Sequence, residues 1–283
     1  MSRRHSTLDA LAFDSIGRFG YLTRRPLSGA GRHKTASATT RAGPPIYPPN
    51  AASPLHIQSI LLFVPVLLFS VIAHEYAHGY AALKQGDDTA LMLGRLTWNP
   101  VKHIDPFMTI LLPAMLLLLS HGRFVLGGAK PVPVNPRKYR RFKRGDIIVS
   151  LAGVATNVVI AIVCVVLIPL FAFGARVAPS LGVSFAILQA MMILGLQLNL
   201  VLALFNLIPI PPLDGSHVIK YLMPVSWAVR YAQVGRVGLI LLIVLLYTGA
   251  FNVMLRPVDL AYGGMIGTVQ RFVLPSTIQW LPQ

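Results

Sequence analysis

Four long apolar runs dominate the chain after its first 55 residues, and each is long enough to cross a bilayer as one helix. They span residues 57 to about 83, 147–173, 185–208 and 237–255. A transmembrane helix needs roughly 20 apolar residues to cross the roughly 30 Å hydrocarbon core. Only 12% of the residues are charged, against roughly 25% in an ordinary soluble domain. We therefore predict an all-α polytopic membrane protein with about four transmembrane helices.

A fifth apolar stretch, residues 107–119, lies between the first two runs. It has only 13 residues and contains Pro113. Stretches of roughly 10–14 apolar residues are more often re-entrant or interfacial than spanning. We expect this stretch to be re-entrant or to lie in the membrane interface.

Residues 1–55 have a different composition from the rest of the chain. They hold eight of the Lys and Arg residues among many Ser, Thr and Gly, with little to bury. This composition predicts a disordered basic tail, although an Arg- and Ser-rich organelle transit peptide has a similar one. We expect an intramembrane core at residues 56–256 and a C-terminal interfacial segment at residues 257–283.

The formal charge of +16 comes partly from the stretch "NPRKYRRFKRGD", which lies directly before an apolar run. Lys and Arg beside a span are typical of the cytoplasmic edge of a membrane protein rather than of a nucleic-acid site. The loop between the second and third runs holds only Arg176. The basic stretch and the segment after the third run are therefore expected on the cytoplasmic side.

The first apolar run contains "HEYAH", which fits the pattern H-E-x-x-H. On a helix, His74 and His78 lie on one face about 5–6 Å apart. They can share one zinc ion, and Glu75 stands close enough to act on its water. A central ionisable residue costs a span about 2.5–3.5 kcal/mol, which favours a site over filler. The alternative is a polar cluster that stabilises helix packing.

A catalytic zinc usually has three protein ligands, so a third must come from elsewhere in the chain. Asp214 follows an apolar run that is broken by three prolines in "IPIPPLDG". Irregular backbone at membrane depth survives only where it is buried in protein or lines a polar cavity. Asp214 is therefore a candidate ligand. A plain cytoplasmic turn is the alternative interpretation, and His217 is a weaker candidate ligand.

The stretches "HEYAHGY" and "FNLIPIPPLDG" together resemble the site-2 protease family of intramembrane zinc metalloproteases. "GRLTWNPVKHIDP", "GGAKPVPVNP" and "SLAGVATN" resemble its small bacterial-type branch, which lacks a PDZ domain. The resemblance covers roughly residues 57–223. It implies one zinc ion per chain with three protein ligands: His74, His78 and Asp214.

The same resemblance implies roles for three further residues. Glu75 would be the catalytic base, and Asn206 a polar group near the substrate carbonyl. Asn157 would contribute to substrate binding. Near this residue the chain departs from the family pattern, because Gly153-Val154 stands where the family often has Gly-Pro. An amide that only packs between helices is the alternative interpretation of Asn157.

The implied activity is hydrolysis of peptide bonds in or near transmembrane segments, with a transmembrane protein as substrate and the bilayer as surroundings. The resemblance favours a bacterial plasma membrane, with the active site open to the cytoplasm. An organelle membrane is the alternative if the tail is a transit peptide. Two other functions stay open: a catalytically silent scaffold that binds client helices, and a membrane zinc hydrolase acting on a non-peptide bond. The oligomeric state is not indicated.

The two halves of the predicted site also constrain the topology. His78 lies toward the end of the first run and Asp214 just after the third, so an even number of crossings must separate them. The runs at 147–173 and 185–208 already supply two crossings. This argument agrees that residues 107–119 do not cross. Residues 124–134 then predict a short extended element beside the site, whose edge could pair with an unfolded substrate.

Overall fold

The computed structural model describes residues 10–13, 19–22, 57–119, 127–248 and 250–281, within two compact units. The smaller unit contains an antiparallel pair of strands, β1 (Ala10–Phe13) and β2 (Phe19–Leu22). In this pair Ala10 is opposite Leu22 and Phe13 is opposite Phe19. No strand was expected here. The other residues of the predicted 1–55 tail lie outside the described residues, so their disorder stays a prediction.

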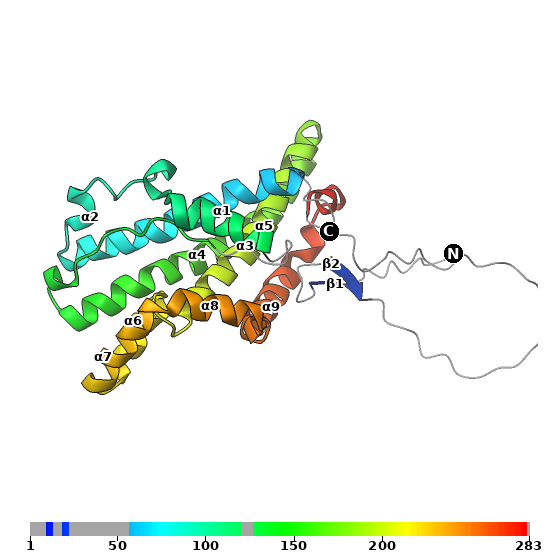
Figure 1. Ribbon diagram of the computed structural model, residues 1–283. Helices are drawn as coiled ribbons and strands as arrows, with labels where there is room; N and C mark the ends of the chain where they lie inside the picture. Colours follow the sequence, from blue (N-terminus) through cyan, green and yellow to red (C-terminus); the bar gives the residue numbers. More distant parts are fainter. Residues whose placement is uncertain (1–9, 14–18, 23–56, 120–126, 249, 282–283) are drawn as a thin grey trace, which may run out of the picture. The chain divides into compact units, whose positions relative to one another are not determined.

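The larger unit, Ile57–Leu281, contains three helices that are long and apolar enough to cross a membrane among the residues described. They are α1 (Ile57–Gln85), α4 (Phe142–Val177) and α5 (Gly182–Leu207). Helix α4 packs along both α5 and α1, and α1 also contacts α5 (Figure 1). The all-α polytopic fold and its first three predicted spans are confirmed.

Helix α4 illustrates why these runs form spans. Its buried side includes Ala161, Cys164 and Ile168, at the three- and four-residue spacing of one helix face. On another side Val166 and Phe173 are 62% and 64% exposed. Small buried residues let helices approach closely within a bilayer, and the exposed apolar side chains can contact lipid.

The fourth predicted span, residues 237–255, is not one helix, and the prediction is wrong in that form. Helix α8 (Gly238–Tyr247) ends there, and α9 begins anew at Ala250 and runs to Val269. Helices α7 (Val225–Gln233) and α8 together could form one span that is bent by 73°. Thr248, directly after α8, lies in a turn. The described residues therefore have three spans, or four if this bent pair crosses.

Residues 106–119 form two short helical pieces, the π-helix η2 (Pro106–Leu111) and α3 (Leu112–Leu119). At about 1.5 Å per residue, their 6 and 8 described residues reach about 21 Å, less than the roughly 30 Å hydrocarbon core. Residues 120–126 lie outside the described residues, so the statement that residues 107–119 do not cross stays a prediction. The remaining short helices are α2 (Thr89–Met92), α6 (Asp214–Ile219), η1 (Pro100–His103), η3 (Pro136–Lys138), η4 (Pro179–Leu181), η5 (Lys220–Leu222), η6 (Val234–Arg236), η7 (Gln270–Phe272) and η8 (Pro275–Trp280).

The extended element expected at residues 124–134 is seen only in part. Residues 127–135 form neither helix nor strand, and residues 124–126 lie outside the described residues. Pro131 and Pro133 have no backbone N–H to donate, so this stretch lacks two of the hydrogen-bond donors that pairing with a neighbouring β-strand would use. We call residues 127–135 the strap, because it lies along α1 and bonds to it.

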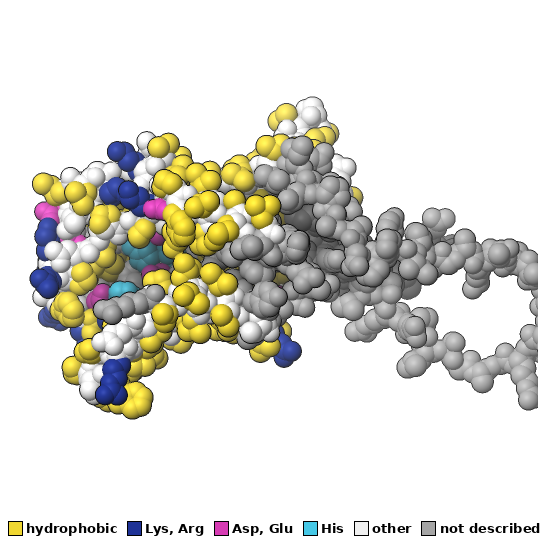
Figure 2. All heavy atoms as spheres, viewed as in Figure 1, with side chains coloured by type: hydrophobic (Ala, Val, Ile, Leu, Met, Phe, Trp, Pro, Cys, Tyr) yellow, Lys and Arg dark blue, Asp and Glu magenta, His cyan; other side chains and the backbone are white. Residues whose placement is uncertain are grey.

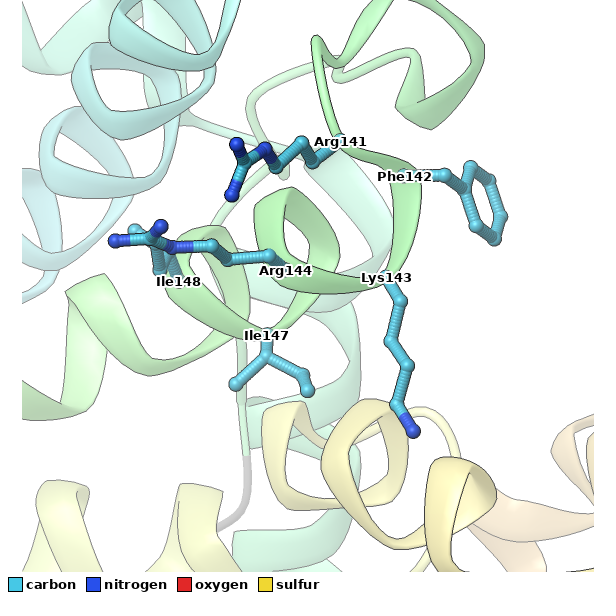
Figure 3. Close-up of a pocket in the computed structure, with 6 residues that line it drawn as sticks. All are labelled: Arg141, Phe142, Lys143, Arg144, Ile147 and Ile148. Atoms are coloured by element: carbon cyan, nitrogen blue, oxygen red, sulfur yellow. The ribbon is translucent and has the colours of Figure 1, made fainter.

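The basic stretch lies at the start of α4. Figure 3 shows that Arg141 and Arg144 extend in a similar direction, whereas Lys143 points elsewhere and Phe142 points away from all three. All four side chains are exposed. Cations beside exposed apolar groups at the end of a span are typical of a cytoplasmic membrane edge.

Candidate metal centre

Three side-chain atoms from two distant parts of the chain converge beside α4. His74 and His78 lie one turn apart on α1, with their Nε2 atoms 3.0 Å apart. Asp214 is the first residue of α6, and its Oδ2 lies 3.2 Å from each of these nitrogens. His74, His78 and Asp214 form a group that could hold a metal ion. The structure thus brings together the three predicted ligands.

The protonation of these groups fits a cation. The backbone oxygen of Val149 lies 2.7 Å from Nδ1 of His78 and can only accept a hydrogen bond, so Nδ1 is the protonated nitrogen. Nε2 of His78 then presents a lone pair toward the carboxylate oxygen of Asp214. Ligand atoms of a tetrahedral zinc site lie roughly 3.3 Å apart, since each is about 2.0–2.1 Å from the ion. The observed separations of 3.0 and 3.2 Å match that spacing.

Helix α4 approaches the histidines so closely that only glycine fits at position 153. A Cβ added to Gly153 would lie 2.5 Å from Cε1 of His74 and 2.5 Å from Nε2 of His78. Val154, which stands in place of the family's frequent proline, is buried at 6% exposure. The departure from the family pattern therefore leaves the contact of Gly153 with the histidines intact.

Glu75 is held by a backbone group of the strap. Its Oε2 accepts a hydrogen bond of 2.8 Å from the backbone N–H of Val132. Val132 is flanked by Pro131 and Pro133, so it supplies the sole backbone N–H of that tripeptide. The side chain of Val132 also packs near Gly79, where an added Cβ would lie 2.9 Å from its Cγ1. The strap is therefore seated against the helix that carries the histidines.

The two predicted asparagines differ in their surroundings. The Nδ2 of Asn206 donates to the carbonyl of Leu202 in its own helix, at 2.9 Å. Asn157 is fully buried, and neither its Nδ2 nor its Oδ1 has a hydrogen-bond partner among the described residues. Buried amides are normally paired. The amide of Asn157, one helical turn after Gly153, can therefore still donate and accept hydrogen bonds. The roles predicted for both residues stay predictions.

Other polar residues near the motifs have structural partners. His217 lies 3.6 Å from Asp146 and is not part of the three-residue group. Asp105 caps η2 by accepting from the backbone N–H groups of Phe107 and Met108.

Sequence reasoning missed the contacts of Val132 and Asp146. The proline spacing in "KPVPVNP" and the lone acid in "RRFKRGD" were the available signals for these two residues.

One face of the larger unit has a hollow in which histidine and acidic side chains are visible, as Figure 2 shows. Three convergent ligand atoms within a helical membrane protein define the class: a membrane protein with a candidate metal centre.

The chain belongs to peptidase family M50, the site-2 protease family, which it matches over residues 62–247. This match includes most of α1 and all of α4, α5 and α6, and therefore all three residues of the metal centre.

Three relatives with curated names carry the designation "Putative zinc metalloprotease". YwhC of Bacillus subtilis is 38% identical over 205 residues, which cover 72% of this chain and 87% of the relative. Rip2 of Mycolicibacterium smegmatis is 30% identical, over 70% of this chain and 71% of the relative. MJ0611 of Methanocaldococcus jannaschii is 31% identical, over 60% of this chain and 76% of the relative. No solved structure matches the chain.

Proposed function

We propose that this protein is an intramembrane zinc metalloprotease that hydrolyses peptide bonds in or near transmembrane segments of membrane proteins. The observation that carries the proposal is the convergence of His74, His78 and Asp214, with Glu75 in the adjacent position on α1. The three groups offer two neutral nitrogens and one carboxylate oxygen, a donor set that suits zinc. The names of the relatives point to the same metal.

When bound, zinc supplies a positive charge that polarises a carbonyl and lowers the pKa of a water to about 7. Glu75 takes the proton of the attacking water and later gives it to the leaving amine. The N–H of Val132 occupies one carboxylate oxygen of Glu75, which leaves the other oxygen to carry this proton.

The two asparagines act on the substrate. Asn206 offers a hydrogen bond to the developing oxyanion, for which its amide must turn away from the Leu202 carbonyl. The amide of Asn157, which has no hydrogen-bond partner among the described residues, binds substrate backbone. Both roles require a substrate that has unwound locally, because the amides of an intact helix are already bonded to one another.

The substrate reaches the site from the bilayer or from the cytoplasmic side of a bacterial plasma membrane. The carbonyl of Val149 contacts His78, and Val149 lies five residues after Arg144 on α4. That separation is about 8 Å along the helix axis. Since Lys and Arg gather at cytoplasmic ends of spans, the basic start of α4 supports a site that opens to the cytoplasm.

The test uses the purified full-length protein in detergent and a transmembrane peptide that contains helix-breaking residues. Wild type is expected to cut the peptide, and a zinc chelator is expected to stop the reaction. Glu75→Gln keeps the metal ligands and is expected to lower the rate by about 10²–10⁴-fold, the usual contribution of a general base. Asp88→Asn is the matched control, because Asp88 is an exposed acid near the end of α1 that pairs with Lys138.

The outcomes separate the competing functions. Equal behaviour of wild type and Glu75→Gln on every substrate would leave a scaffold that binds client helices. Chelator-sensitive hydrolysis of an ester but never of a peptide would leave a non-peptide hydrolase. Purified protein that lacks stoichiometric zinc and takes up none would refute the metal assignment.

A further inference from the structure

Asp146 is a buried carboxylate outside the group of three ligands. It lies in the first turns of α4 and is 3% exposed, although its neighbours Arg141, Lys143 and Arg144 are exposed. Lys220 Nζ lies 2.6 Å from its Oδ2, and the Tyr221 hydroxyl donates to the same oxygen at 2.8 Å. A buried carboxylate needs such partners, because its desolvation is costly.

Among the described residues, the side-chain partners of Asp146 come from one segment, and that segment begins with a metal-centre residue. Helix α6 starts at Asp214 and continues into η5, which holds Lys220 and Tyr221. His217, in the same segment, has its Nδ1 3.6 Å from Oδ1 of Asp146. Asp146 thus binds the C-terminal end of the short segment whose first residue is Asp214.

The attachment to Asp146 is strengthened by two cations near Tyr221. Lys143 Nζ lies 5.5 Å and Lys220 Nζ lies 5.0 Å from the centre of the Tyr221 ring. Figure 3 shows Lys143 extending away from Arg141 and Arg144. Burial, together with the Asp146 carboxylate, raises the pKa of the Tyr221 hydroxyl above its usual range. The hydroxyl therefore stays protonated and remains a donor.

The same face of α4 also contacts the two histidines of α1. Asp146, Val149 and Gly153 are spaced by three and four residues, which places them on one side of a helix. The Val149 carbonyl orients His78, and Gly153 lies against both imidazoles. One helix face therefore contacts the histidines directly and contacts Asp214 through the segment that carries it.

We propose that Asp146 is a positioning residue of the metal centre: it holds α6 and η5 against α4 so that the Asp214 carboxylate meets the two histidines. The proposal rests on the proposed function only in taking His74, His78 and Asp214 as the metal ligands. It assigns to Asp146 a measurable part of the metal affinity, without contact with the metal.

The experiment measures metal affinity on the full-length metal-free protein in detergent, by competition between the protein and a chromogenic chelator for Zn²⁺. Asp146→Asn keeps the shape of the side chain and removes the charge. It is expected to weaken Zn²⁺ binding about 10- to 100-fold, the usual effect of losing a group that orients a ligand. Asp88→Asn, which breaks an exposed ion pair of the same 2.6 Å length, is expected to leave the affinity unchanged.

A second readout does not depend on metal. Hydrogen exchange of the backbone amides in residues 214–222 of the metal-free protein is expected to become faster in Asp146→Asn, whereas exchange within α5 stays as in wild type. A variant with a general loss of stability would raise exchange in both places. Local acceleration is therefore specific to the loss of the attachment to α6 and η5.

A milder variant keeps the proposal testable if Asp146→Asn does not fold. Tyr221→Phe removes one hydrogen bond from the same carboxylate and is expected to weaken Zn²⁺ binding by roughly tenfold at most. The proposal is refuted if Asp146→Asn, or Tyr221→Phe where it alone folds, binds Zn²⁺ as tightly as Asp88→Asn does. Loss of affinity without any proteolysis by wild type would instead refute the proposed function and leave this inference standing.

Discussion

Replacing Gly153 by alanine tests the proposed metal centre most directly. The new Cβ would lie 2.5 Å from a carbon of His74 and a nitrogen of His78. Non-bonded carbon atoms are at their best separation at about 3.5–4.0 Å. The imidazoles or α4 must therefore move by about 1 Å. Overpacking of this kind typically costs about 1–3 kcal/mol of folding stability.

A shift of about 1 Å is large for a site whose ligand atoms are 3.0 and 3.2 Å apart. Misplacement by about 1 Å can lower a catalytic rate by about 100-fold, and we expect a loss of that order in peptide cleavage by Gly153→Ala. Its Zn²⁺ affinity should fall as well. Chelator competition measures the affinity, Co²⁺ absorption spectra report the ligand geometry, and cleavage of a transmembrane peptide reports the rate.

The matched control is Gly263→Ala. Gly263 also lies inside a helix, α9, and an added Cβ there meets nothing within 4 Å. Both substitutions bring the same helix-propensity gain of about 1 kcal/mol, so that effect cancels in the comparison. If Gly153→Ala binds Zn²⁺ and cuts peptide as Gly263→Ala does, the close approach of α4 to the histidines is not part of the site.

Two further variants probe contacts outside the metal ligands. Val132→Pro removes the N–H that bonds Glu75, so peptide cleavage should slow by about 10-fold or more while the Zn²⁺ content stays unchanged. Val134→Pro, in the same strap, is the control. Equal cleavage rates for the two variants would show that this donor does not matter. Gln189→Leu removes an amide that donates to Ile168 and Phe272 and accepts from Leu274 and Thr277. Each buried group left unpaired costs about 1–3 kcal/mol, so the variant should unfold at a clearly lower temperature in detergent. Its Zn²⁺ affinity should stay the same. An unchanged unfolding temperature would contradict the assigned role of these hydrogen bonds.

The predicted spans illustrate where sequence reasoning holds and where it fails. The runs that became α1, α4 and α5 are continuous and apolar, and their length alone decides that they form helices in a bilayer. The fourth run, residues 237–255, is as apolar. Its composition did not reveal where α8 ends, because the run stays apolar on both sides of Tyr247.

The metal centre divides in the same way. His74 and His78 are four residues apart, and helix geometry alone places them on one face. Asp214 was reached through a sequence motif, since it is 136 residues after His78 by their numbers. No local rule brings such distant residues together, and their 3.2 Å approach is a property of the packed helices.

The sequence by itself determined the membrane class, three of the spans, and the pairing of two histidines with a neighbouring acid, because these follow from length, apolarity and helical period. Only the tertiary structure decided that Gly153 lies against both imidazoles, that Val132 holds Glu75, and that Asp146 ties down α6. Each of these is a contact between separate elements. Such contacts depend on how the helices pack, which the pattern within any one segment does not encode.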